Sequence, residues 1–120
     1  MEQLATVSNA VVSIFSECYG RGPTKAKSYA FDNYVITVLE DLLTTVERTL
    51  VNNGEQELVR RVRLTFQEIE ADRFKDAVAE AMGRKVVTYH SQVVFDPPMG
   101  FEIFVLEPQE GDEPETGKQD

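Results

Sequence analysis

Two glycines, one arginine and two lysines occur together in the segment YGRGPTKAK, residues 19–27, a composition typical of an anion-binding loop. A phosphate-binding P-loop requires G-x-x-x-x-G-K-[ST], with a run of free backbone N–H groups ahead of a helix. Here Pro23 removes one N–H, and helical periodicity precedes the segment instead of following it. We therefore interpret the segment as a sharp corner after a helix. Binding of an anion by Arg21, Lys25 and Lys27 is the alternative.

A second basic cluster, RRVR, falls in the first turns of a predicted long helix. Three arginines close to a helix start oppose the helix dipole, so we expect them to have acidic partners. Glu47, Asp41 or another subunit would supply these partners, and a pocket for a small anion is the sharper alternative. The candidate residues for binding an anion or a partner are Arg21, Lys25, Arg60, Arg61 and Arg63.

Motifs for catalysis or metal binding are absent from the sequence. His90 is the only histidine, and no Cys or His lies near it at the spacing of a zinc site. Cys18 falls on the apolar stripe of a predicted helix, where a thiol behaves as a small hydrophobic group. No G-x-S-x-G nucleophile elbow occurs. We expect a protein that is not an enzyme and that has no metal and no cofactor.

The length and the charge limit the classes of partner. A chain of 120 residues favours one domain, which we place at residues 1–108. The net charge of −9 opposes binding to nucleic acid and to anionic lipid, because phosphate binding requires clustered Lys and Arg. Residues 109–120 contain five acidic residues and one lysine and no large apolar residue, so we expect a disordered acidic tail.

Compartment is indicated by two features of the sequence. No apolar run approaches the roughly 20 residues of a membrane span, and no secretory signal pattern opens the chain. A single cysteine cannot form an internal disulfide, which suits a reducing compartment. We expect a cytoplasmic protein that does not insert directly into a membrane.

The first part of the chain predicts a helix followed by a β-hairpin. Apolar residues recur at spacings of three and four up to Cys18, and Gly20 then ends the helix. Two runs rich in β-branched and aromatic residues, 25–31 and 34–40, flank the turn-forming pair Asp32-Asn33.

Two helices are predicted next. Thr44 and Glu47 fit a capping box that starts a short helix. Residues 55–82 form the longest periodic segment, which Gly83 ends. At 1.5 Å per residue this helix would be about 40 Å long unless it bends where its apolar stripe slips by one residue. The stripe consists of Leu58, Val62, Phe66 and Ile69, and after the slip of Phe74, Ala77, Val78 and Ala81.

Two further strands, 85–95 and 101–107, complete the chain, and the prolines of DPPMG between them predict an extended loop. The order is therefore α-β-β-α-α-β-β. We expect an α+β domain in which two antiparallel hairpins form a four-stranded sheet with the helices on one face.

Both faces of two predicted strands are apolar. In FEIFVLE, Phe101, Ile103 and Val105 alternate with Phe104 and Leu106, and YVITVLE behaves in the same way. A sheet with one face in water should alternate apolar and polar residues. We therefore expect a second subunit, most simply in a homodimer, to cover the face without helices. Division of the helices between the two faces is the alternative.

Several stretches together resemble the MpsC-like domain family. They are YGRGPTKAK, DNYVITVLEDLLTTVERTL, LVRRVR, MGRKVVTYHSQVVFDP and FEIFVLEP. The family is named for a Na+-translocating, membrane-potential-generating system. The resemblance implies an accessory or regulatory component linked to Na+ or bicarbonate transport, with a protein partner at a membrane transport system and no catalytic residue. A regulatory domain that binds a small anion through its arginines is the alternative.

Overall fold

The structure is a computed structural model that describes residues 2–109. Its elements follow the predicted order α-β-β-α-α-β-β, which confirms the α+β class. The predicted tail lies outside the described residues except for Gln109. The elements are α1 Glu2–Tyr19, β1 Lys25–Phe31, β2 Tyr34–Glu40, α2 Thr45–Asn52, α3 Gln56–Met82, β3 Val86–Phe95 and β4 Pro98–Leu106.

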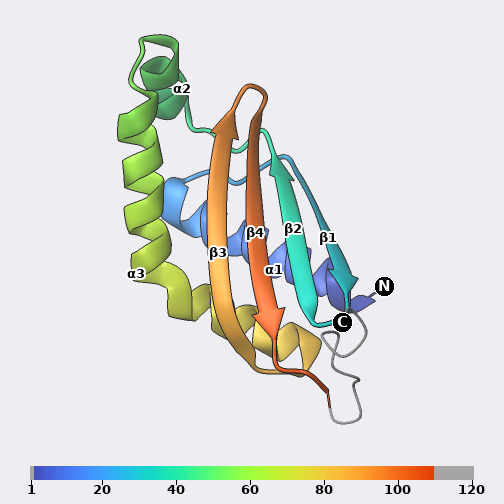
Figure 1. The fold of residues 1–120 in the computed structure, drawn as a ribbon. Coiled ribbons are helices and arrows are strands. Elements are labelled where there is room, and N and C mark those ends of the chain that lie inside the picture. The colour runs from blue at the N-terminus through green and yellow to red at the C-terminus, as the bar shows by residue number, and fades with distance from the viewer. Residues whose placement is uncertain (1, 110–120) are drawn as a thin grey trace, which may run out of the picture.

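The strands form one four-stranded sheet in the order β1-β2-β4-β3 (Figure 1). Each hairpin pairs its own two strands, and antiparallel pairing of β2 with β4 joins the hairpins. In this central pairing Ile36 lies opposite Ile103 and Val38 lies opposite Phe101. Residues opposite each other point to the same face, so the register sets which side chains form each face.

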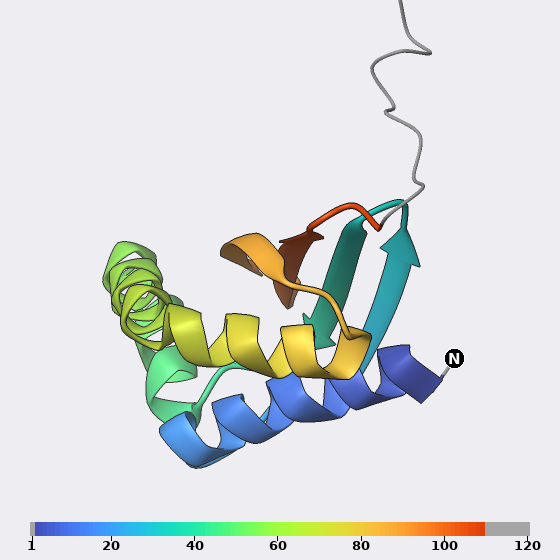
Figure 2. The same cartoon turned by 90° about the horizontal axis from the view of Figure 1, so that it is seen from below.

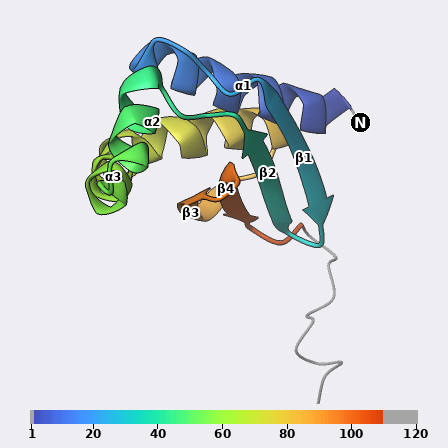
Figure 3. The same cartoon turned by 90° about the horizontal axis from the view of Figure 1, so that it is seen from above.

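The helices lie on one face of the sheet, as predicted. Figures 2 and 3 show α1 and the second half of α3 side by side on the same side of the strands. Val7 and Val11 of α1 and Phe74 and Val78 of α3 are fully buried, so both helices contribute to one core against the sheet. Within residues 2–109, no helix has the length and apolar character that crossing a membrane requires.

The first hairpin has the predicted boundaries. Phe31 pairs with Tyr34, so Asp32 and Asn33 form a two-residue turn. Asp32 has φ 53°, in the left-handed region that Asp and Asn tolerate better than most residues.

The extended loop predicted at DPPMG is wrong. Phe95 pairs with Pro98, so the turn contains only Asp96 and Pro97, and β4 begins at Pro98. Proline is tolerated at the first residue of a strand, where its missing N–H does not interrupt the ladder. A Cβ at Gly100 would lie 2.9 Å from Cδ1 of Leu42, so the Leu42 side chain packs closely over this strand position.

Local signals located the ends of the helices correctly. Thr44 Oγ1 accepts a hydrogen bond from the Glu47 backbone N–H at 3.1 Å, and Glu47 Oε1 accepts one from the Thr44 N–H at 2.9 Å. This is the predicted capping box at the start of α2. Gly83 has φ 70° just after α3, as expected for a helix-ending glycine.

The predicted apolar stripe of α3 is wrong in its first half except for Phe66, which packs against the core. Val62 and Ile69 are 49% and 73% exposed, whereas Val59 and Arg63 face the core. An apolar pattern leaves out Arg63, which lies in the core because Glu47 pairs with it. In the second half Phe74 and Val78 are buried as predicted. Figures 1 and 2 show α3 bending between these halves, where the apolar pattern slips.

Candidate functional site

The sheet face without helices, here called the outer face, has an apolar centre. It consists of Tyr34, Ile36 and Val38 of β2 with Phe101, Ile103 and Val105 of β4. Tyr34 is 38% exposed and the other five are half-buried. Among residues 2–109, no helix or strand covers these side chains.

Both faces of the sheet are therefore largely apolar, but helices cover only one of them. On β2, Val35 and Leu39 point to the helices and are buried, whereas Ile36 and Val38 point outward. Tyr29 and Phe31 of β1 extend the apolar surface with exposures of 49% and 57%. Contiguous exposed apolar surface on a small domain is typical of an interaction site.

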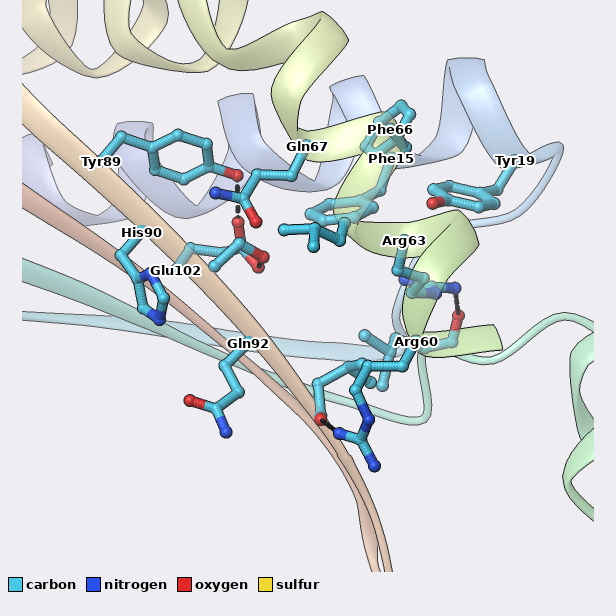
Figure 4. A pocket seen from close by; sticks show the side chains of 14 residues that line it. Phe15, Tyr19, Arg60, Arg63, Phe66, Gln67, Tyr89, His90, Gln92 and Glu102 are labelled. Carbon is cyan, nitrogen blue, oxygen red and sulfur yellow. Dashed lines mark hydrogen bonds between the residues drawn. The ribbon is translucent and has the colours of Figure 1, made fainter. Parts of the chain in front are cut away.

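A cavity of about 320 Å³ lies on the opposite side of the sheet, between the first half of α3 and the edge strand β3 (Figure 4). Most of the surface that lines it is apolar, and the lining residues come mainly from α1, α3 and β3. The polar groups on its walls include Tyr19, Arg63, Gln67, Tyr89 and Glu102.

Glu102 is the buried acid of this cavity and is only 1% exposed. Its Oε1 accepts a hydrogen bond from the Tyr89 hydroxyl at 2.5 Å, and its Oε2 accepts one from Ser91 Oγ at 2.7 Å. Burial raises the pKa of Glu102 to about 7, although both hydrogen bonds act in the opposite direction. The carboxyl group therefore changes charge near neutral pH.

Arg63 also lines the cavity, but its donors bind groups of its own chain. Nε donates to Glu47 Oε2 at 2.8 Å, and Nη2 donates to Glu47 Oε1 at 2.6 Å and to the Leu42 carbonyl at 3.0 Å. The guanidinium also stacks 4.3 Å from the centre of the Tyr19 ring. The expectation of a Glu47 partner is therefore confirmed for Arg63.

Arg21 is held in a similar way by the connection between β2 and α2. It donates to the Leu43 carbonyl at 2.5 Å and to Asp41 Oδ2 at 3.2 Å. Arg48 donates to the same carbonyl at 3.1 Å. Arg21, Arg48 and Arg63 thus satisfy the carbonyls of this connection, which is an architectural role.

Of the other candidate residues, Arg60 lines the same cavity as Arg63, whereas Arg61 and Lys25 lie away from it. Arg60 pairs with Glu57 at 3.4 Å and donates to the Val93 carbonyl at 3.2 Å. Arg61 is exposed on α3 and Lys25 is exposed on β1, and neither makes an ion pair within residues 2–109. The five candidates therefore do not converge on one pocket.

Cys18 and His90 are exposed. Cys18 lies beside Arg73, whose Nη1 is 3.8 Å from the sulfur, so the expectation of a thiol on the apolar face of the helix is wrong. His90 is opposite Ile103 on the outer face, at the edge of the sheet.

Two parts of the site were missed by sequence reasoning. Glu102 shares the alternation of Phe104 and Leu106, so its burial on the helix side could have been inferred from its position in the strand. The contact between Tyr19 and the cavity had no sequence signal, because Tyr19 meets α3 only after the chain has folded.

A family model described as Na+-translocating membrane potential-generating system (MpsC) matches residues 2–108. The chain belongs to the MpsC family. No curated protein and no solved structure matches it. The MpsC match spans every helix and strand, so the family assignment applies to the whole described fold.

The stretches that resemble the MpsC family contain Arg21, Asp41, Thr44, Glu47 and Arg63. In this MpsC chain these residues hold the β2–α2 connection against α1 and α3. These residues of the stretches therefore have a structural role in holding the fold together, and none of these contacts indicates a reaction or a ligand.

Proposed function

We propose that this chain is a non-enzymatic accessory subunit of a Na+-translocating, membrane-potential-generating system. Its outer face binds a protein component of that system. The observation that carries the proposal is the open apolar centre of the outer face, which faces away from all helices within residues 2–109. The family description supplies the system to which the partner belongs.

Charge favours a protein over a lipid surface as the partner. Lys25 and Lys27 of β1 border the apolar centre, and Glu40 is paired with Lys25 in the register. Two lysines and one carboxylate make the border of the outer face weakly positive, while the whole chain has a net charge of −9. Anionic membranes attract dense basic clusters, so this chain would be repelled overall. A protein surface that is apolar and bordered by carboxylates fits better.

We also propose a cytoplasmic location for the subunit. The free, exposed thiol of Cys18 suits a reducing compartment. In this arrangement the chain attaches to the membrane-embedded components from the cytoplasmic side and regulates or stabilises them without entering the bilayer. Linkage to bicarbonate as well as Na+ is part of the proposal.

Regulation by a small anion has weaker support. Arg21 and Arg63 already donate to their own chain, and Arg60 is held by Glu57 and Val93. Of the five candidate residues, Arg61 and Lys25 are the two that make no ion pair within residues 2–109, and they lie on different elements.

The test is capture of the membrane subunits of the system after co-expression with the tagged chain and solubilisation in mild detergent. Wild type should retain them, and Ile36→Lys and Ile103→Lys should lose them while keeping the wild-type circular dichroism spectrum. Val46→Lys is the matched control, because it places the same charge at an exposed apolar position but on α2.

Two further measurements separate the alternatives. Binding of the chain to phosphatidylglycerol vesicles that lack protein would make the outer face a lipid site and overturn the proposal. A Na+-dependent potential measured with a voltage-sensitive dye should require the wild-type outer face. Repeating that measurement with and without bicarbonate tests the linkage to bicarbonate.

A further inference from the structure

The first half of α3 has an apolar stripe that no described part of the chain covers. Leu58, Val62 and Ile69 are 36%, 49% and 73% exposed, and Thr65 lies between them. These positions are spaced by four, three and four residues. At about 100° per residue, the four side chains fall within an arc of about 60°. Repeats of three and four are those of a coiled-coil seam.

This stripe, here called the α3 seam, is separate from both features described above. Arg60 and Gln67 point from the other side of the helix toward the cavity (Figure 4). The outer face is on the far side of the sheet from α3. A partner can therefore occupy the α3 seam without touching the outer face or closing the cavity.

Two opposite charges flank the seam on its solvent side. Arg61 and Glu68 directly precede Val62 and Ile69, so each occupies the position beside the seam from which coiled-coil helices form salt bridges. Both are exposed, and neither makes an ion pair within residues 2–109. Most other charges on α3 with a suitable neighbour are paired, including Arg60 with Glu57 and Arg73 with Glu70.

We propose that the α3 seam binds the α3 seam of a second copy of this chain, with the two helices antiparallel. In that register Leu58 meets Ile69 of the second copy, and Val62 meets Thr65. Arg61 then lies beside Glu68 of the second copy, and the two-fold axis repeats this pair, so both unpaired charges are satisfied twice.

The charges also select the direction of the helices. In a parallel pair, Arg61 would lie near Phe66 of the second copy and Glu68 would lie near Arg73. Arg73 is already paired with Glu17 and Glu70, so it has little need of a further carboxylate. Only the antiparallel pair gives Arg61 a carboxylate.

This homodimer differs from the one expected from the sequence, which would have used the outer face. It leaves the outer face open, so each dimer presents two outer faces to the proposed protein partner. The inference does not depend on the proposed function, because it rests on the α3 seam alone.

The experiment is sedimentation equilibrium of the full chain and of charge-reversal variants. Wild type should dimerise. Arg61→Glu and Glu68→Arg should each weaken the dimer by about tenfold or more, since each places like charges together. The double variant Arg61→Glu/Glu68→Arg should recover the dimer, because it exchanges the charges of every pair.

A matched control excludes a simple effect of net charge. Arg61→Glu/Glu80→Arg carries the same net charge as the double variant, but Glu80 is exposed in the second half of α3, away from the seam. It should stay dissociated. A monomeric wild type, recovery in this control, or loss of the dimer in Ile103→Lys with no effect of Arg61→Glu would each overturn the proposal.

Discussion

Arg63 and Glu47 form a two-point ion pair that ties α3 to the first turn of α2. The Nε–Oε2 distance is 2.8 Å and the Nη2–Oε1 distance is 2.6 Å, and the two side chains are 7% and 9% exposed. Glu47 also accepts the Thr44 N–H, so the capping box and the ion pair share one carboxylate. A residue that looked like part of a binding cluster therefore holds two helices together.

Removing Arg63 should destabilise the fold strongly. Arg63→Ala leaves the Glu47 carboxylate buried without its partner, so we expect a loss of about 3–5 kcal/mol in the free energy of unfolding. Urea denaturation followed by circular dichroism measures this loss. Arg61→Ala, at an exposed position on the same helix, is the control and should change the monomer's free energy of unfolding by less than about 0.5 kcal/mol when it is measured below the dimerisation range.

The Arg63–Glu47 ion pair predicts that the protein loses stability in acid. Burial acts to raise the pKa of Glu47, but the hydrogen bonds from Arg63 and Thr44 outweigh it and lower that pKa below its usual 4.5. A lowered folded-state pKa contributes stability above the unfolded value, and this is lost as the pH falls through the folded value. Urea denaturation below pH 4.5 should therefore show a loss in wild type that Arg63→Ala lacks. An equal loss in both proteins would contradict the assignment.

Glu102 should make the protein more stable in mild acid than in mild alkali. Its pKa is raised to about 7 from 4.5, so the folded state holds a proton that the unfolded state has lost between these values. Stability from this group is complete below about pH 4.5 and declines as the pH rises to about 7, by about 3 kcal/mol in total. Urea denaturation across this range measures the decline.

Glu102→Gln isolates this effect, because glutamine has the same shape and does not titrate. The variant should be more stable than wild type above neutral pH and should lose the decline between mild acid and neutral pH. Tyr89 and Ser91 hydroxyls can accept from the amide as well as donate to it. If the free energy of unfolding depended on pH in the same way in both proteins, Glu102 would be ionised throughout the range, and the prediction would be wrong.

The corrected face of α3 can be tested with one pair of truncations. Phe74 is 0% exposed and Ile69 is 73% exposed. Phe74→Ala should therefore cost about 3–5 kcal/mol, and Ile69→Ala should change the monomer's free energy of unfolding by about 0.5 kcal/mol or less. Measurement at a protein concentration below the dimerisation range keeps the α3 seam out of the comparison. Equal losses would mean that the original stripe was right.

Small anions should not stabilise the protein. A ligand that binds only the native state raises stability by RT ln(1 + [L]/Kd), so even weak specific binding is visible at about 20 mM ligand. Bicarbonate, phosphate and sulfate, compared with chloride at equal ionic strength, should leave the melting temperature unchanged. A saturable rise that Arg61→Ala or Lys25→Ala abolishes would instead support the anion-binding alternative.

The sequence predicted elements whose signals are local. The first hairpin, the capping box and the glycine after α3 each depend on a few adjacent residues, and all were located correctly. The order β1-β2-β4-β3 was not predictable, because the β2–β4 pairing joins residues about 65 apart that have no local signal.

The remaining errors arose where tertiary contacts reversed the usual preference of a residue. Arg63 is in the core only because Glu47 neutralises it, so a pattern that treats arginine as exposed shifts the apolar stripe. Glu102 is buried because Tyr89 and Ser91 satisfy its oxygens from the neighbouring strand. By contrast, the alternation in FEIFVLE is local, so the sequence alone predicts that both faces of this strand are apolar, including the outer face.

The most direct measurement is capture of the membrane subunits by wild type and by Ile103→Lys, each first shown to be folded. Wild type should retain the subunits, Ile103→Lys should lose them, and the control Val46→Lys should retain them. Equal retention by wild type and Ile103→Lys would contradict the claim that the outer face is the binding surface.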